Sequence, residues 1–167
     1  MRRIFTITFC IALVFILSSC ASFIEGIASL NGDWEYKITN DYAIERMNYL
    51  DISLFRFEPG PSIGDRLLDD NVFIQEFCLN KNTVGIKYII LNDSDIYDDE
   101  KHIKIQDKTV LYDDTFLCRY MVYDLTEEKI LADYDKKEDM EYFCEYNGYI
   151  TEFDWISTSS KPNGAHW

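Results

Sequence analysis

Two apolar segments joined by a short polar turn constrain the fold of this chain most strongly. The segments "VFIQEFCL" at 72–79 and "TVGIKYII" at 83–90 are rich in β-branched and aromatic residues, which favour strands. Only "NKN" separates them, and a turn this short joins neighbouring antiparallel strands. The pattern predicts a β-hairpin, and it favours an antiparallel β domain built around that hairpin.

Other segments support the same fold class. Strand-like patterns recur before and after the hairpin, at 34–38, 42–47, 51–57, 116–125, 129–133 and 149–155. The second and third of these resemble the arms of another hairpin around Asn48. The stretch 58–71 contains two prolines and two glycines, so it is expected to be a loop and not a central strand.

One late segment has the marks of a helix. Asp135 is followed three residues later by Glu138, a spacing that resembles a capping box, and apolar residues then recur at helical spacing. The pair Asn147-Gly148 supplies a stop signal. The sequence therefore predicts a helix over 136–146.

Together these patterns predict a mainly β fold. We expect an antiparallel meander that forms either an open sheet or a small barrel, with one C-terminal helix and a cleaved signal helix ahead of it. The expected organisation is a signal peptide at 1–19, a tether at 20–29, a β-rich domain at 30–156 and a flexible tail at 157–167. Aromatic residues make up 16% of the chain, which is enough to build a core.

The N-terminus is typical of a secretory signal. Arg2 and Arg3 form a positive flank, an apolar run follows from Ile4 to Leu17, and small residues come next. A helix of this length rises about 21 Å, which is short of the roughly 30 Å of a hydrocarbon core. We therefore expect cleavage after the run instead of a membrane-spanning helix.

The run ends in Leu17-Ser18-Ser19-Cys20, which resembles the lipobox of bacterial lipoproteins. The resemblance implies cleavage between Ser19 and Cys20, with a diacylglycerol attached to the Cys20 thiol. Two acyl chains anchor a protein durably, because each buried methylene contributes about 0.8 kcal/mol. We expect a lipoprotein anchored in the cell membrane, with its domain on the extracytoplasmic face.

The net charge of the chain limits the classes of molecule that it can bind. Thirty acidic residues against 16 basic ones give a net charge of −14. Cleavage of the signal peptide would remove two further positive charges, those of Arg2 and Arg3. Such a chain repels the phosphates of nucleic acids. We predict no nucleic-acid partner; the expected partners are the membrane, through the lipid, and an unidentified protein or small molecule.

Three cysteines remain beyond the signal and the lipid site: Cys78, Cys118 and Cys144. An odd number leaves at least one thiol free, and none belongs to a CxxC pair. Each lies among apolar or aromatic neighbours. We expect buried free thiols, with a Cys78–Cys118 bridge as the alternative.

The sequence lacks recognisable catalytic motifs. It has no GxSxG, no HExxH and no glycine-rich phosphate loop, and its only histidines are His102 and His166. Neither histidine has a sequence neighbourhood that marks it as the base of a catalytic triad. We predict a protein that is not an enzyme and that needs no cofactor. Carboxylates brought together from separate strands are the remaining route to catalysis.

An acidic stretch is the sharpest candidate for metal binding. Asp93, Asp95 and Asp99 offer oxygen ligands at spacings that suit Ca²⁺. An EF-hand loop starting at Asp93 would need glycine at its sixth position and glutamate at its twelfth, where this chain has Asp98 and Lys104. We therefore predict a solvated acidic loop and keep the three aspartates as weak candidate ligands.

Several segments resemble a family of small bacterial lipoproteins, of Gram-positive type, whose domain has no assigned function. The resemblance lies in "DWEYKITNDYAIERMN", "FIQEFCLNKNTVGIKY" and "YMVYDLTEEKI", and it covers most of 33–146. It implies strands, turns and a late short helix, and it supplies no catalytic residues.

A second resemblance is to the lipocalins. Gly32-Asp33-Trp34 matches the G-x-W that opens a lipocalin barrel, where the tryptophan closes the floor and a late arginine packs on it. Arg119 is the candidate partner of Trp34.

From the sequence as a whole we predict a lipid-anchored, non-enzymatic binding domain, with exposed Tyr and Trp on a sheet face as its contact surface. The alternative is a lipocalin-like carrier of a small apolar ligand.

Overall fold

The strands of this protein form two antiparallel sheets. The computed structural model describes residues 33–48, 51–57, 64–91, 110–112 and 116–166. The first sheet has the order β1-β2-β3-β4, and its strands are β1 (Trp34–Lys37), β2 (Tyr42–Asn48), β3 (Asp51–Arg56) and β4 (Asp65–Arg66). The expected hairpin of β2 and β3 is confirmed. The short β4 lies at the sheet edge, inside the segment predicted to hold no central strand.

The second sheet has the order β8-β7-β6-β5-β9. Its strands are β5 (Val72–Asn80), β6 (Thr83–Ile90), β7 (Arg119–Asp124), β8 (Lys129–Tyr134) and β9 (Ile156–Ser157). The β5–β6 pair is the predicted central hairpin, with Asn80 opposite Thr83 and Lys81 at φ 53° in the turn. A 3-10 turn, η1 (Val110–Tyr112), precedes β7. The described strands do not close on themselves, so the open-sheet prediction is confirmed and the small-barrel alternative is wrong.

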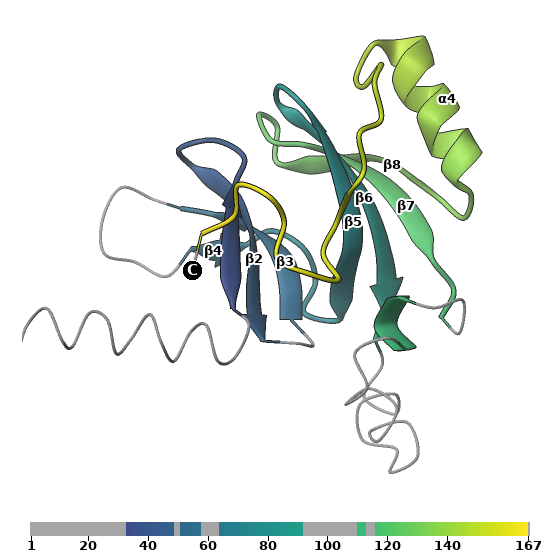
Figure 1. The fold of residues 1–167 in the computed structure, drawn as a ribbon. Coiled ribbons are helices and arrows are strands. Elements are labelled where there is room, and N and C mark those ends of the chain that lie inside the picture. The colour runs from purple at the N-terminus through teal and green to yellow at the C-terminus, as the bar shows by residue number, and fades with distance from the viewer. Residues whose placement is uncertain (1–32, 49–50, 58–63, 92–109, 113–115, 167) are drawn as a thin grey trace, which may run out of the picture.

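The two sheets and helix α4 (Lys137–Asn147) form three layers (Figure 1). The larger apolar cluster lies between the sheets and contains Ile44, Ile52 and Leu54 from the first and Phe77 and Ile86 from the second. A smaller cluster lies on the other face of the second sheet, where α4 packs on β7 and β8. Successive side chains of a strand point to opposite faces, so the second sheet is buried on both.

The smaller cluster depends on a glycine in β6. Gly85 lies opposite Cys78 of β5, and a Cβ placed on Gly85 would lie 2.6 Å from the Cys78 Sγ. It would also lie 3.2 Å from the Cδ1 of Ile150, which the chain brings back over the sheet after α4. The absence of a side chain at Gly85 therefore lets these two groups pack directly against the sheet.

Helix α4 begins and ends close to the predicted positions, but its start is capped differently. Its N-cap is Lys136, and no side chain donates or accepts a capping bond there, so the predicted capping box is wrong. The Asp135 carboxylate instead lies 3.3 Å from the guanidinium of Arg119. At the other end Gly148 adopts the left-handed conformation, with φ 71°, and its N–H bonds to carbonyls of the last turn. The predicted stop signal is therefore confirmed.

The C-terminal segment belongs to the folded unit, and the prediction of a flexible tail from 157 is wrong for residues 157–166. The last strand is β9, not the predicted 149–155, and it pairs with β5. Thr158 is fully buried, and its hydroxyl donates to the carbonyls of Ile74 and Gln75, where β5 has a bulge. His166 then exchanges two backbone hydrogen bonds with Glu35 of β1. The segment thus runs from one sheet to the other (Figure 1).

An ion pair also joins the sheets. Arg56 of β3 donates two hydrogen bonds of 2.9 Å to the carboxylate of Glu128, which lies in the turn between β7 and β8. The hydroxyl of Tyr42 donates a third bond to the same carboxylate. The shared carboxylate fixes the β7–β8 turn against the first sheet, and Glu128 adopts a positive φ of 49° in that turn.

Candidate functional site

Most of the residues that the sequence nominates for function lie outside the described part of the chain. Ser19, Cys20, Asp93, Asp95 and Asp99 all fall there, so lipid attachment and calcium binding stay predictions. Within the described ranges, no group of three or more His, Cys, Asp or Glu side chains could hold a metal ion. No helix within those ranges has the length and apolar character needed to cross a bilayer.

The other nominated pair, Trp34 and Arg119, belongs to different sheets. Trp34 is buried in the cluster between the sheets, at the start of β1. Arg119 lies at the start of β7, where its guanidinium binds the carboxylates of Asp133 and Asp135. The lipocalin floor pair also requires a barrel, which the described strands do not form.

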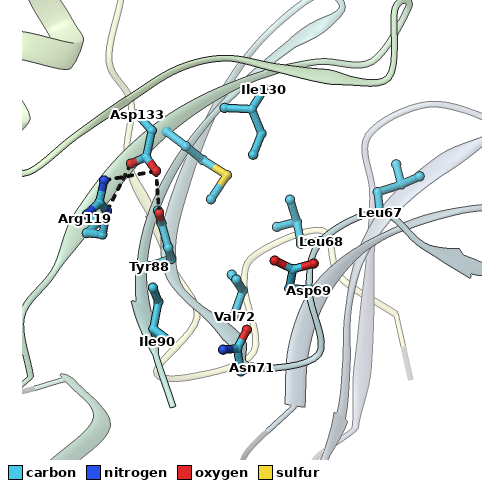
Figure 2. A pocket seen from close by; sticks show the side chains of 11 residues that line it. Leu67, Leu68, Asp69, Asn71, Val72, Tyr88, Ile90, Arg119, Ile130 and Asp133 are labelled. Carbon is cyan, nitrogen blue, oxygen red and sulfur yellow. Dashed lines mark hydrogen bonds and ion pairs between the residues drawn. The ribbon is translucent and has the colours of Figure 1, made fainter. Parts of the chain in front are cut away.

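Arg119 instead belongs to a cleft of about 310 Å³ beside the second sheet. One wall is the segment that connects β4 to β5, and the other is formed by β6, β7 and β8 (Figure 2). Six lining residues are apolar: Leu67, Leu68, Val72, Ile90, Met121 and Ile130. Five are polar: Asp69, Asn71, Tyr88, Arg119 and Asp133.

The polar residues on the β6–β8 side form one connected cluster. The Tyr88 hydroxyl donates a 2.8 Å hydrogen bond to the Asp133 carboxylate. Arg119 approaches the same carboxylate with two nitrogens, at 3.2 and 3.3 Å, and Asp135 with a third. Figure 2 shows Tyr88, Arg119 and Asp133 together at one side of the cleft. A carboxylate held by a guanidinium and a phenol is fixed in position, because charge-assisted bonds are the stronger kind.

Tyr88 and Arg119 do not change protonation state near neutral pH. Burial, together with the hydrogen bond to Asp133, raises the pKa of Tyr88 to about 12. The hydrogen bond and the charge of Asp133 also raise the pKa of Arg119. The phenol therefore stays protonated and the guanidinium stays charged, so neither group is suited to exchange a proton during a reaction near neutral pH.

Two apolar residues of the cleft are exposed to solvent, whereas Leu68, Val72 and Met121 are buried. Ile130 in the edge strand β8 is 51% exposed, and Ile90 at the end of β6 is 42% exposed. Leu67 is half-buried on the facing wall. Apolar side chains that line a hollow and remain in water favour the entry of an apolar group, because its binding removes their surface from solvent.

On the opposite wall Asp69 and Asn71 are exposed. A ligand in the cleft therefore meets an apolar middle with hydrogen-bonding groups on both sides (Figure 2). The volume lies at the lower limit of the range usual for small-molecule sites. The arrangement can hold a small amphipathic molecule or one apolar side chain of a partner.

Sequence patterns alone did not predict this cleft. They nominated Arg119, but for a different partner, and they missed Tyr88 and Asp133. Tyr88 and Arg119 face each other in the β6–β7 register, whereas Asp133 joins them from β8. Neither Tyr88 nor Asp133 stands out in its own strand. Their proximity becomes evident only when the register of β6, β7 and β8 is known.

The three thiols have no disulfide. Cys78 and Cys144 are buried in the cluster under α4, and Cys118 is half-buried, so the prediction of free packing cysteines is confirmed for the first two. Burial raises the pKa of Cys78 to about 12 and that of Cys144 to about 11. Both therefore stay protonated and unreactive at neutral pH.

Known proteins offer no further guide to this site. No family model, no curated protein and no solved structure matches the chain. The resemblance to small lipoproteins thus stays a prediction from the sequence.

Proposed function

We propose that this chain is a lipid-anchored protein on the extracytoplasmic face of the cell membrane, and that its β-rich domain is a non-enzymatic binding module. The binding site is the cleft between the β4–β5 connection and strands β6 to β8. Its ligand is a small amphipathic molecule or an apolar side chain of a partner. The observation that carries the proposal is a hollow of about 310 Å³ with six apolar lining residues, of which Ile90 and Ile130 are exposed to solvent.

Binding explains the polar cluster better than catalysis does. The Asp133 carboxylate is engaged by Tyr88 and Arg119, and Tyr88 holds its proton well above neutral pH. A general base needs a free lone pair and a pKa near the working pH. A fixed carboxylate with its partners instead makes a rigid wall, which lowers the entropy lost on binding.

The lipocalin-like carrier is less well supported. A lipocalin encloses its ligand in a closed barrel. Here the space between the sheets is filled by the larger apolar cluster, in which Phe73, Phe77 and Ile86 are fully buried. A ligand of this domain would therefore bind in the cleft beside the second sheet.

An NMR titration with 4-methylphenol tests the cleft, since this probe has an apolar ring and a hydroxyl group. We expect the methyl signals of Ile90, Met121 and Ile130 to shift in a saturable way. The variant Ile130→Asp should abolish the shifts, because it places a charge in the apolar wall. Leu117→Asp is the matched control: Leu117 is 79% exposed and does not line the cleft, so it should bind the probe normally. Unchanged cleft signals at millimolar probe, or equal losses in both variants, would refute the site.

A separate experiment tests the anchor. The wild-type chain should incorporate labelled fatty acid, and it should remain in the membrane fraction after a high-salt wash. Cys20→Ser should lose the label and the processing before residue 20. A Cys20→Ser chain that is processed and retained like the wild type would exclude the lipid anchor and leave the cleft proposal standing.

A further inference from the structure

The outer face of α4 carries two exposed tyrosines among unpaired carboxylates. Met140 and Cys144 point into the cluster on the second sheet, so the opposite side of the helix faces solvent. At 100° per residue, that side contains Glu138, Asp139, Tyr142, Glu145 and Tyr146. We call these five residues the tyrosine face. It belongs to the side of α4 that faces away from the second sheet (Figure 1), and none of its residues lines the cleft.

The two tyrosines form a single aromatic surface. Tyr142 is 69% exposed and Tyr146 is 78% exposed, and their rings stack with centroids 6.1 Å apart and planes 23° from parallel. Large aromatic side chains at neighbouring exposed positions are typical of protein contact surfaces, where tyrosine is enriched. The sequence led us to expect such a surface on a sheet, but it lies on the helix.

The carboxylates of the tyrosine face have no cationic partner. None of Glu138, Asp139 and Glu145 forms an ion pair with any residue in the described ranges. Glu145 lies in the last helical turn, which contains no basic residue. The carbonyl end of a helix is partly negative, so a carboxylate there is unfavourable and a cation favourable. This end of α4 therefore gains most from a positively charged partner.

The inner edge of the same helix shows how such a cation can be held. The Nζ of Lys137 lies 5.0 Å from the centre of the Trp155 ring and 3.5 Å from the carboxylate of Glu141. An ammonium group between an aromatic ring and a carboxylate satisfies both its charge and its preference for a π face. The tyrosine face repeats the pairing of ring and carboxylate, but within the described chain no lysine or arginine completes it.

We propose that the tyrosine face docks a basic segment of a partner protein, with arginine or lysine side chains over the two rings and beside Glu138 and Glu145. Charge complementarity selects this partner, since the chain as a whole has a net charge of −14. The rings add specificity, because long-range attraction alone does not distinguish one part of an acidic surface from another. This surface is separate from the cleft, so each can be tested without the other.

Fluorescence anisotropy with a labelled peptide of alternating arginine and glycine tests the proposal on the full chain in non-ionic detergent. The peptide with citrulline in place of arginine is the uncharged control and should not bind. The variant Tyr142→Ala/Tyr146→Ala leaves the net charge unchanged, and it should weaken binding at least about fivefold through the loss of two cation–π contacts. Alanine is a strong helix former, so this variant should keep its helix, which circular dichroism checks.

Two charge variants separate docking from general attraction. Glu138→Gln/Glu145→Gln removes two charges from the tyrosine face. Asp41→Asn/Asp70→Asn removes two exposed charges that lie in the β1–β2 turn and in the β4–β5 connection. We expect the first variant to weaken binding and the second to remain within about twofold of wild type, because distant exposed charges are screened. Wild-type affinity in the tyrosine variant, or equal weakening by both charge variants, would overturn the proposal.

Discussion

Glu35 of β1 and Glu45 of β2 lie directly opposite each other, and their carboxyl groups share a hydrogen bond. Such a bond needs one proton between the two groups. Burial, and after it the charge and hydrogen bond of Glu35, raise the pKa of Glu45 to about 7. Lys37 on β1 forms an ion pair with Glu35, and Asp51 on β3 adds further negative charge near Glu45. The first sheet thus contains a carboxylic acid that is protonated in mild acid.

This pair makes stability depend on pH in the range from about 4.5 to 7. The folded state binds the Glu45 proton more tightly than the unfolded state, whose glutamate has a pKa near 4.5. Stability therefore falls as the pH rises from 4.5 to 7 and is level above it, with a loss on the order of 2 kcal/mol. Urea unfolding at pH 5 and pH 8 measures the change.

The variant Glu45→Gln is the control for this prediction. Its amide can donate to Glu35 at any pH, so the difference in stability between pH 5 and pH 8 should shrink and the variant should be the more stable protein at pH 8. An identical pH dependence in the two proteins would show that other groups cause it.

The close approach of Gly85 to Cys78 predicts that Gly85→Ala is destabilising and that a second substitution, Cys78→Ala, restores part of the lost stability. A methyl group at Gly85 would meet the Cys78 Sγ at 2.6 Å, so Gly85→Ala should lower the free energy of unfolding by about 1–3 kcal/mol. Removing the sulfur with Cys78→Ala creates the missing space. Urea unfolding of the two single variants and the double variant should then give a favourable coupling energy. Strictly additive losses would mean that the added methyl group meets a different obstacle.

The bulge in β5 predicts that Thr158 contributes to stability. Its buried hydroxyl donates to the Ile74 and Gln75 carbonyls and lies 3.1 Å from the Tyr112 hydroxyl. Thr158→Val keeps the shape but removes the buried hydroxyl that these groups share, while the backbone N–H of residue 158 still donates to the Gln75 carbonyl, so we expect a cost of about 1–3 kcal/mol. Ser159→Ala, at an exposed neighbour, should change stability little. Thermal unfolding of both variants checks the prediction, and equal midpoints would contradict it.

The three thiols should react at very different rates with Ellman's reagent. Cys78 and Cys144 are buried, and their pKa values are raised to about 12 and about 11, so they should react only after unfolding. Cys118 is half-buried, and its Sγ donates to Gln75, so it should react first. In a version lacking residues 1–20, Cys118→Ser should remove the early phase; an early phase that persisted would show that α4 opens readily.

Local patterns predicted the parts of this fold that depend on neighbouring residues. The β5–β6 hairpin follows from β-branched runs around a short turn, and the end of α4 follows from Gly148, which adopts the positive φ that glycine permits. The capping of α4 was mispredicted because the Asp135 carboxylate had two available roles. Arg119, which is distant in sequence, binds its carboxylate and draws it away from the helix end.

The division into two sheets and the cleft could not be read from the sequence. Both depend on the register between strands and on which face each strand buries. The segment after Ser157 illustrates the difficulty, since its serines, proline and glycine suggest a solvated tail. The backbone hydrogen bonds of Thr158 and His166 hold it in place, and backbone groups leave no mark on composition.

The bridge between Glu35 and His166 has a consequence for the order in which the chain matures. β1 is the first described strand in the chain, yet the partner at its outer edge, His166, follows the last described strand. Contacts between residues so far apart in sequence form late and slowly. If the chain is exported, as we propose, this pairing cannot form while His166 is still inside the translocation channel. The first sheet then gains the partner at its outer edge only after His166 has left the channel.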